Sequence, residues 1–275
     1  PLVIIVSIDG GKPALIQQLL RKGQLKAIKT LTQQGAYHFK ARTIVPSLTL
    51  PSHTSMLTGL SYKKHGVNWN HYSMRRGKIK ATNIFQLAKK KGLQTGMIYN
   101  KKKFLHLVRP KSLDSDIYIR QRNPLHVANA TIKAFQNTRL QLLFVHFRAP
   151  DSAGHRYGWG HQKHKQPPSK QYLDSLRQCD KALGAIVKAL KTQKRWRKTL
   201  FLVTADHGGH GYTHGSASTE DRWIPWIAAG GLVKRKGNLE GKEKIDTMDT
   251  AATALKTLGV PIPKSMDGKP IELSK

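Results

Sequence analysis

Acidic residues are scarce in this sequence, and cysteine is almost absent. The chain of 275 residues has 15 Asp and Glu against 48 Lys and Arg, which gives a formal net charge of +33. Its one cysteine, Cys179, excludes an internal disulfide, and the helical pattern around it indicates packing rather than catalysis. No apolar run approaches the roughly 20 residues of a membrane-spanning helix, so we expect no transmembrane segment.

The excess of positive charge has two interpretations. A concentrated basic groove would bind nucleic acid, whereas a surface that is basic everywhere would bind anionic polymers and surfaces non-specifically. Lys and Arg are spread over the whole chain, and short runs at 89–91 and 101–103 do not alternate with aromatic residues. This pattern favours a generally cationic surface, natural or engineered, with non-specific nucleic-acid binding as a consequence of the charge.

The few acidic residues occur in motifs that could carry chemistry. No Glu occurs before Glu220, and three of the first seven acidic residues are Asp9, Asp151 and Asp206. All three lie close to glycine, and two of them lie close to histidine. Because carboxylates are so rare in this chain, we expect a larger share of those present to be needed for function.

The pattern of apolar residues predicts an α/β fold. Buried strands are expected at 2–8, 95–99, 142–147 and 199–205, with a weaker candidate at 225–229. Helical patterns lie between them, at 14–21, 52–58, 83–91, 125–135, 170–190 and 247–258. Alternation of strands and helices predicts a mostly parallel central sheet between two layers of helices. The length suits a single domain over residues 1–275.

Polar side chains follow several of these strands directly. Asp9 follows the first strand, Asp151 follows 142–147, and Asp206 with His207 follows 199–205. In open parallel sheets, ligands bind beyond the carboxyl ends of the strands. We therefore expect these residues to converge at one edge of the sheet.

The motif from Asp206 to Gly215 is the strongest candidate for metal binding. It contains Asp206, His207 and His214 among four glycines, and carboxylate with imidazole is a ligand set that suits zinc. Asp151 and His155 are four residues apart, which places both on one side of a helical turn. Asp9 could add a third carboxylate. The alternatives are a glycine-rich loop with incidental histidines and Asp residues that only cap helices.

The segment from Pro46 to His53 offers a nucleophile. Thr49 precedes a predicted helix, whose N-terminal field would stabilise a bound phosphate. A metal ion would lower the pKa of its hydroxyl group. Ser47, Ser52 and Thr54 carry hydroxyl groups too, so chemistry alone does not select Thr49. His53 is interpreted as structural.

The order of these motifs resembles a known family. It consists of Asp9, the segment 49–53 (TLPSH), 58–60 (TGL), His65-Gly66, Asp151 with His155, 206–208 (DHG) and His214-Gly215. This set is similar to the alkaline phosphatase superfamily, and most similar to its type I phosphodiesterase/nucleotide pyrophosphatase branch. The likeness runs from Val3 to about Gly230, and 249–252 (DTAA) with Asp267-Gly268 fits as well.

This resemblance implies two divalent ions, zinc in the family. One would be bound by Asp151, His155 and His214, and the other by Asp9, Thr49, Asp206 and His207. Thr49 falls at the position of the family's nucleophile, and Asn70 falls where the family has an Asn that contacts a phosphoryl oxygen. His210 matches no ligand position and is interpreted as a supporting or surface residue.

The resulting prediction is a metal-dependent phosphoric ester hydrolase that forms a phosphothreonine intermediate. No Arg lies within a few residues of Thr49. Because phosphomonoesterases of the superfamily often place an Arg there, this favours phosphodiesters or nucleotide pyrophosphates as substrates. A sulfatase is disfavoured, since Cys179 does not lie in the motif that sulfatases require.

Two alternatives and a location complete the prediction. The first alternative is a phosphomonoesterase of the same superfamily. The second is a cationic protein that binds nucleic acid or other anions without catalysis. The resemblance also implies a periplasmic or extracellular location.

Overall fold

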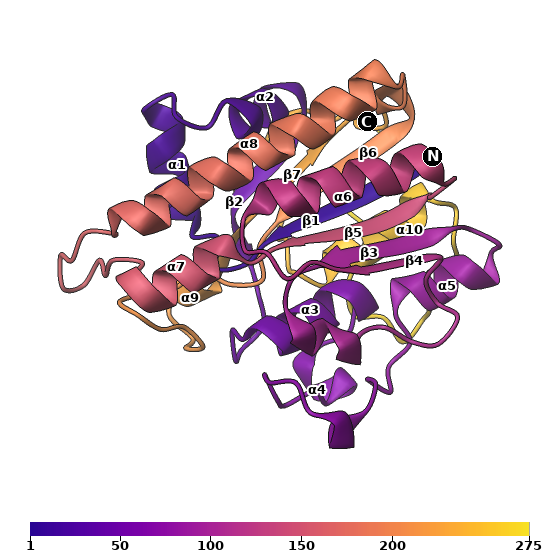
Figure 1. Ribbon diagram of the computed structural model, residues 1–275, viewed down its shortest axis with the longest axis horizontal. Helices are drawn as coiled ribbons and strands as arrows, with labels where there is room; N and C mark the ends of the chain where they lie inside the picture. Colours follow the sequence, from indigo (N-terminus) through magenta and orange to yellow (C-terminus); the bar gives the residue numbers. More distant parts are fainter. Residues whose placement is uncertain (275) are drawn as a thin grey trace.

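One eight-stranded sheet organises the molecule, a computed structural model that describes residues 1–274 (Figure 1). In sheet order the strands are β4 (Ser115–Tyr118), β3 (Thr95–Tyr99), β5 (Leu142–Phe147), β1 (Leu2–Ile8), β6 (Thr199–Thr204), β7 (Trp223–Ala229), β2 (Ala36–Arg42) and β8 (Gly237–Asn238). Across the described residues, β7 alone runs against the direction of the other strands. The mostly parallel sheet expected from the sequence is confirmed.

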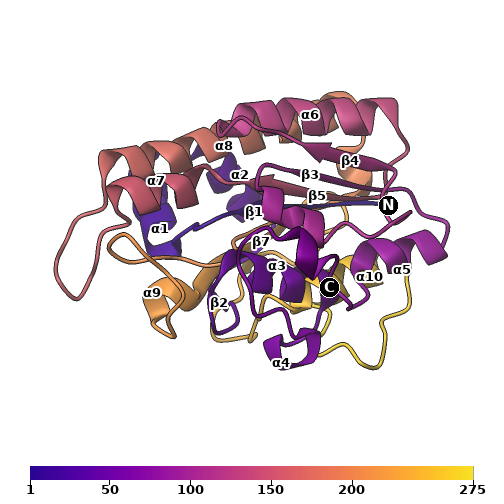
Figure 2. The same cartoon turned by 60° about the horizontal axis from the view of Figure 1, so that its bottom comes forward.

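Helices cover both faces of the sheet, as Figure 2 shows. One face is packed by α1 (Pro13–Arg21), α2 (Lys26–Gln34), α6 (Pro124–Asn137) and α8 (Lys170–Thr192). The other is packed by α3 (Thr49–Thr58), α5 (Ile84–Lys90) and α10 (Asp249–Thr257). Three further α-helices lie at the periphery, α4 (Tyr62–His65) beside α3, α7 (Ala149–Tyr157) beside α8, and α9 (Thr219–Arg222) before β7.

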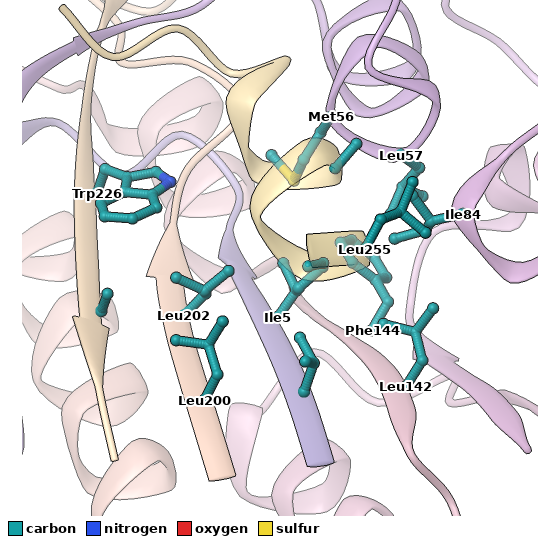
Figure 3. Close-up of a cluster of buried hydrophobic side chains, with 14 of the residues drawn as sticks. Ile5, Met56, Leu57, Ile84, Leu142, Phe144, Leu200, Leu202, Trp226 and Leu255 are labelled. Atoms are coloured by element: carbon teal, nitrogen blue, oxygen red, sulfur yellow. The ribbon is translucent and has the colours of Figure 1, made fainter. Parts of the chain in front are cut away.

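The central strand β1 shows why the buried strands are uniformly apolar. All seven of its residues are buried, because successive side chains enter opposite cores. Ile4 and Val6 pack toward α1 and α8, whereas Val3 and Ile5 pack toward α3 and α10. Figure 3 shows Ile5 in the second core, together with side chains from helices and neighbouring strands. Burial of each such side chain stabilises the fold by roughly 1.5–3 kcal/mol.

The strands predicted at 2–8, 95–99 and 142–147 match β1, β3 and β5, and those at 199–205 and 225–229 match β6 and β7 within two residues. The sequence did not predict β2, β4, β8 or α2. In β2 the ladder with β7 is interrupted by a bulge between His38 and Ala41, which breaks the alternation of apolar residues. Among residues 1–274 no helix is long and apolar enough to cross a membrane.

Candidate active site

The site lies where four neighbouring strands end at the same edge of the sheet. β3, β5, β1 and β6 are adjacent and parallel, so their carboxyl ends meet. Asp9 follows β1, Asp206 and His207 follow β6, and Asp151 lies in the first turn of α7 after β5. The turn after β1 needs Gly10, which has φ of +69° and whose amide donates to Asp206 Oδ1 at 3.1 Å.

Each of the three carboxylates has one oxygen bound by the protein. Asp9 Oδ2 accepts from His146 Nε2 at 2.8 Å and from Lys101 Nζ at 2.7 Å. Asp151 Oδ2 accepts from Lys101 Nζ at 2.6 Å. Asp206 Oδ1 accepts from the backbone amides of Gly10 and His207, each at 3.1 Å. These contacts fix the orientation of all three carboxylates.

The other oxygen of each carboxylate is buried without a hydrogen-bond donor among the described residues. These atoms are Asp9 Oδ1, Asp151 Oδ1 and Asp206 Oδ2. A buried acceptor without a donor is costly, and a charged one more so. They lie in two groups whose potential ligand atoms are within 4.8 Å of one another, Asp9 with Asp206 and His207, and Asp151 with His207 and His214.

The histidines direct ring nitrogens at the same atoms. His207 Nε2 lies 3.5 Å from Asp9 Oδ1 and 3.2 Å from Asp206 Oδ2. His214 Nε2 lies 3.5 Å from Asp151 Oδ1. His155 Nε2 lies 3.4 Å from the same oxygen, although His155 is half exposed and stands outside both groups. His207 thus lies between the two groups, whereas the sequence interpretation gave it to one of them.

Backbone contacts determine which nitrogen of each ring faces the carboxylates. Nδ1 of His155, His207 and His214 lies 2.9 Å from the carbonyl oxygen of Tyr212, Gly208 and Ser47 respectively. Since a carbonyl oxygen only accepts, Nδ1 carries a hydrogen, so each ring in its neutral form directs the Nε2 lone pair at the carboxylates. A metal-binding histidine has this arrangement. The residues present therefore fit divalent cations.

The pKa values of the three carboxylates differ because they are buried together. Burial raises the pKa of Asp9 and of Asp151, but the Lys101 ammonium and the neighbouring histidines together outweigh this effect and hold both pKa values below the ordinary value. Burial and the negative charge of Asp9 raise the pKa of Asp206 well above its ordinary value. Without a bound cation, three adjacent carboxylates are thus too many to remain ionised together.

Thr49 lies beside these groups at the first residue of α3. Its Oγ1 is 3.4 Å from His207 Nε2 and 3.4 Å from Lys101 Nζ. The competing hydroxyl groups are bonded elsewhere, Ser47 to the carbonyl of Ser216, Ser52 to Thr43 Oγ1 and Thr54 to the carbonyl of Leu50. The geometry therefore favours Thr49 among the hydroxyl groups of this segment.

His53 and Asn70 support the segment around Thr49. The His53 ring bonds Ser7 Oγ at 2.8 Å and the Thr49 carbonyl at 2.7 Å, so both nitrogens have structural partners. Asn70 Oδ1 accepts from the Leu50 amide at 2.9 Å and from Lys103 Nζ at 3.0 Å. Because both partners are donors, the NH2 group of Asn70 is the part left for another acceptor. His210 lies outside the metal-ligand groups and bonds Asp221 Oδ1 at 2.7 Å.

Three site residues were missed in the sequence. Lys101 and Lys103 were interpreted as a surface run, and His146 as part of an apolar strand. Yet Asn100 and Lys101 follow β3 directly, which is the same rule that located Asp9 and Asp206. The site opens into a pocket of about 420 Å³, lined among others by Thr49, Asn70, Lys101, Lys103, Asp151 and His214.

Comparison with known proteins gives consistent matches. The family model described as "Type I phosphodiesterase / nucleotide pyrophosphatase" matches residues 3–255. Ectonucleotide pyrophosphatase/phosphodiesterase family member 1 of Homo sapiens is 23% identical over 229 residues, which are 76% of this chain and 23% of that protein. Curated relatives are longer, and the chain spans 23% to 49% of the first two.

Solved structures share the fold. Murine ectonucleotide pyrophosphatase/phosphodiesterase 5 superposes with a TM-score of 0.78 at 16% identity, covering 96% of each chain. A 2-O GAG sulfatase superposes with a TM-score of 0.79 at 14% identity, covering 98% of this chain and 73% of the other. Such low identity establishes the architecture alone, so the chemistry must be argued from the residues of the site.

Proposed function

This chain belongs to the type I phosphodiesterase/nucleotide pyrophosphatase family, and from that premise we propose that it hydrolyses phosphate esters with Thr49 as the nucleophile. The observation that carries the proposal is the set of three unpaired carboxylate oxygens and three Nε2 atoms beside the Thr49 hydroxyl group. Neither a hydrophobic core nor a surface ion pair accounts for such a set.

Two divalent ions, zinc by analogy with the family, would be bound at this place. Asp9, Asp206 and His207 would bind one, with Thr49 adjacent to it. Asp151, His214 and His155 would bind the other, with His207 between the two. When bound, such ions stabilise negative charge on phosphoryl oxygens and lower the pKa of a coordinated hydroxyl group.

The residues of the chain position the reactants. Oγ1 of Thr49 attacks phosphorus and loses its proton, the bond from phosphorus to the leaving oxygen breaks, and that oxygen departs with the electron pair and takes up a proton. Water then attacks the phosphothreonine, the bond from phosphorus to Oγ1 breaks, and Thr49 regains its hydroxyl group. The NH2 group of Asn70 and the positive N-terminus of α3 face the non-bridging oxygens and stabilise their charge.

The substrate class follows in part from the family. The relatives' names describe phosphodiesterases and nucleotide pyrophosphatases, which makes phosphodiesters and pyrophosphates the first candidates. A phosphomonoester is the second candidate, and the choice depends on which groups meet the non-bridging oxygens.

"Ecto" in the same names supports an extracellular or periplasmic place of action. Fractionation of expressing cells checks this, and recovery of the protein in the cytoplasm would contradict it.

Replacing the nucleophile tests the proposal. We expect Thr49→Ala to lower kcat by roughly 10³-fold or more, because the covalent route is lost, with zinc content unchanged. Thr49→Ser, which keeps a hydroxyl group, is the matched control and should retain measurable turnover. The assay uses p-nitrophenyl phosphate and bis-p-nitrophenyl phosphate, with zinc and with EDTA, and zinc is counted by elemental analysis.

Two outcomes would contradict it. Full activity of Thr49→Ala would exclude the nucleophile. Absence of hydrolysis by the zinc-loaded protein, together with salt-dependent binding to DNA or heparin, would instead support the cationic binding protein.

A further inference from the structure

Two ammonium groups from a distant part of the chain enter the pocket that contains the nucleophile. Lys101 and Lys103 follow β3, and Lys101 Nζ lies 3.4 Å from Thr49 Oγ1, a residue 52 positions away. Lys103 Nζ lies 3.0 Å from Asn70 Oδ1. Lys102, between them, is exposed at the rim of the same pocket, with its ammonium 4.6 Å from the ring centre of Tyr72. Burial therefore distinguishes Lys101 and Lys103 from Lys102.

The two ammonium groups have different partners. Lys101 is 8% exposed and bridges Asp9 and Asp151, so its charge is already compensated. Lys103 is half-buried, and in residues 1–274 no carboxylate lies within ion-pair distance of its Nζ. Burial, with the charge of Lys101, lowers the pKa of Lys103 to about 8. A half-buried cation without a counterion, in the same pocket as the reacting hydroxyl group, indicates a place for an anionic oxygen of the substrate.

This arrangement removes the argument for a diester that came from the residues around Thr49, and leaves only the names of the relatives in its favour. That preference rested on the absence of an Arg close to Thr49 in the sequence. The fold supplies cations from the segment after β3 instead. We propose, on the basis of the function proposed above, that Lys103 beside Lys101 selects phosphate monoesters, whose dianionic phosphoryl group offers an additional charged oxygen to the Lys103 ammonium.

The physical reason is a difference in charge and in desolvation. A monoester dianion carries one more negative charge than a diester monoanion. An anionic oxygen at Lys103 would form a charge-assisted hydrogen bond in a partly dry site, where such bonds are strong. The second ester group of a diester would place an uncharged substituent there and leave the ammonium desolvated without compensation.

The ratio of two specificity constants tests this inference. The kcat/KM values for p-nitrophenyl phosphate and methyl p-nitrophenyl phosphate are compared in the zinc-loaded wild type, Lys103→Met and Lys188→Met. We expect the wild type to prefer the monoester. Lys103→Met should lower the monoester value by about 10- to 100-fold, the range of one hydrogen bond to a charged group, and change the diester value by less than about threefold. Lys188→Met, which removes an exposed lysine of α8 on the sheet face opposite α3, is the matched control for the loss of one charge, and its ratio should stay within about threefold of wild type.

A binding measurement separates recognition from turnover. Inorganic phosphate, a dianion at pH 8, is titrated calorimetrically into the same proteins, and dimethyl phosphate is the monoanionic comparison. Lys103→Met should weaken phosphate binding by at least about tenfold and leave dimethyl phosphate unaffected. Equal zinc content and an equal melting temperature show that the variant is folded.

The inference and the proposed function fail in different ways. A wild type that prefers the diester, or a Lys103→Met variant that loses both substrates equally, overturns the inference while Thr49-dependent hydrolysis still stands. A preference for the monoester that persists in a fully active Thr49→Ala variant overturns the proposed nucleophile instead.

Discussion

The charge of Lys103 responds to pH close to neutrality. Burial, with the charge of Lys101, lowers its pKa to about 8, so most of the ammonium is present at pH 7 and it is lost as the pH rises through 8. If the ammonium binds the substrate, kcat/KM for p-nitrophenyl phosphate in the zinc-loaded enzyme falls on the alkaline side of pH 8. The pH dependence of kcat/KM, which reports groups of the free enzyme, measures this directly.

Lys103→Arg isolates this residue from other ionisations. A guanidinium stays protonated throughout the range, so a decline caused by Lys103 should move to higher pH in the variant. An alkaline limb that is identical in wild type and Lys103→Arg would assign the decline to another group and count against Lys103 as the binding cation.

Individual side chains show how far sequence could locate the site. Asp9, Asp151 and Asp206 were placed because each follows a strand, a position that requires only the strand pattern. Lys101 follows β3 in the same way. Because the chain has 48 Lys and Arg residues, however, a lysine after a strand did not stand out as a site residue. The orientation of each ring, which depends on carbonyl groups such as those of Ser47 and Tyr212, requires the folded backbone.

At the scale of elements, α7 positions the site through an unusually close contact. A Cβ atom on Gly154 would lie 2.2 Å from Trp159 Cε2, and Trp159 is fully buried, with its Nε1 donating to the Gly10 carbonyl at 3.0 Å. Gly154 sits between Asp151 and His155 on this helix. Gly154→Ala must therefore displace α7 or the indole, which should destabilise the protein by about 1–3 kcal/mol and weaken zinc binding.

Gly184 in α8 provides the matched control. A Cβ atom there would meet only Ala27 Cβ, at an ordinary 3.5 Å. Gly184→Ala should be neutral or stabilise the protein by up to ~1 kcal/mol, since alanine favours the helical backbone. Urea unfolding in EDTA and zinc titration compare the two variants. Equal stability and equal zinc affinity of both would show that the Trp159 contact does not hold α7.

Some strands and helices could be predicted from the sequence more easily than others. β1, β3 and β5 are buried on both faces of the sheet. Their almost entirely apolar sequences predict this burial. β4 is an edge strand of alternating intermediate and exposed residues, so its short sequence resembles a loop. The first turn of α3, which carries Thr49, was expected to begin later because Pro51 usually marks a helix start.

At the scale of the molecule, two hydrophobic cores share one sheet. Ile4 and Ile5 belong to different cores although they are adjacent in β1. We therefore propose that residues 1–275 form one domain, as the length suggested. Two separate transitions in the urea unfolding of the Gly184→Ala control would contradict this proposal.

The net charge of +33 should also act on the reaction at long range. A positive potential attracts anionic substrates, and salt screens it over about 10 Å at 0.1 M. We expect kcat/KM for the zinc-loaded enzyme to fall as NaCl increases, when substrate capture limits the rate. The fall on a logarithmic scale should be about twice as steep for the dianion p-nitrophenyl phosphate as for the monoanion methyl p-nitrophenyl phosphate, because the attraction scales with substrate charge.

A variant far from the pocket distinguishes this field from local contacts. Lys188 and Lys191 are exposed on α8, which covers the sheet face opposite α3. Replacing both with Glu changes the net charge by four without touching the site. The double variant should have a lower kcat/KM than wild type in low salt and the same value in high salt, where screening removes distant charges. If the two proteins respond to salt identically, attraction is confined to the pocket, and the surface charge has no part in substrate capture.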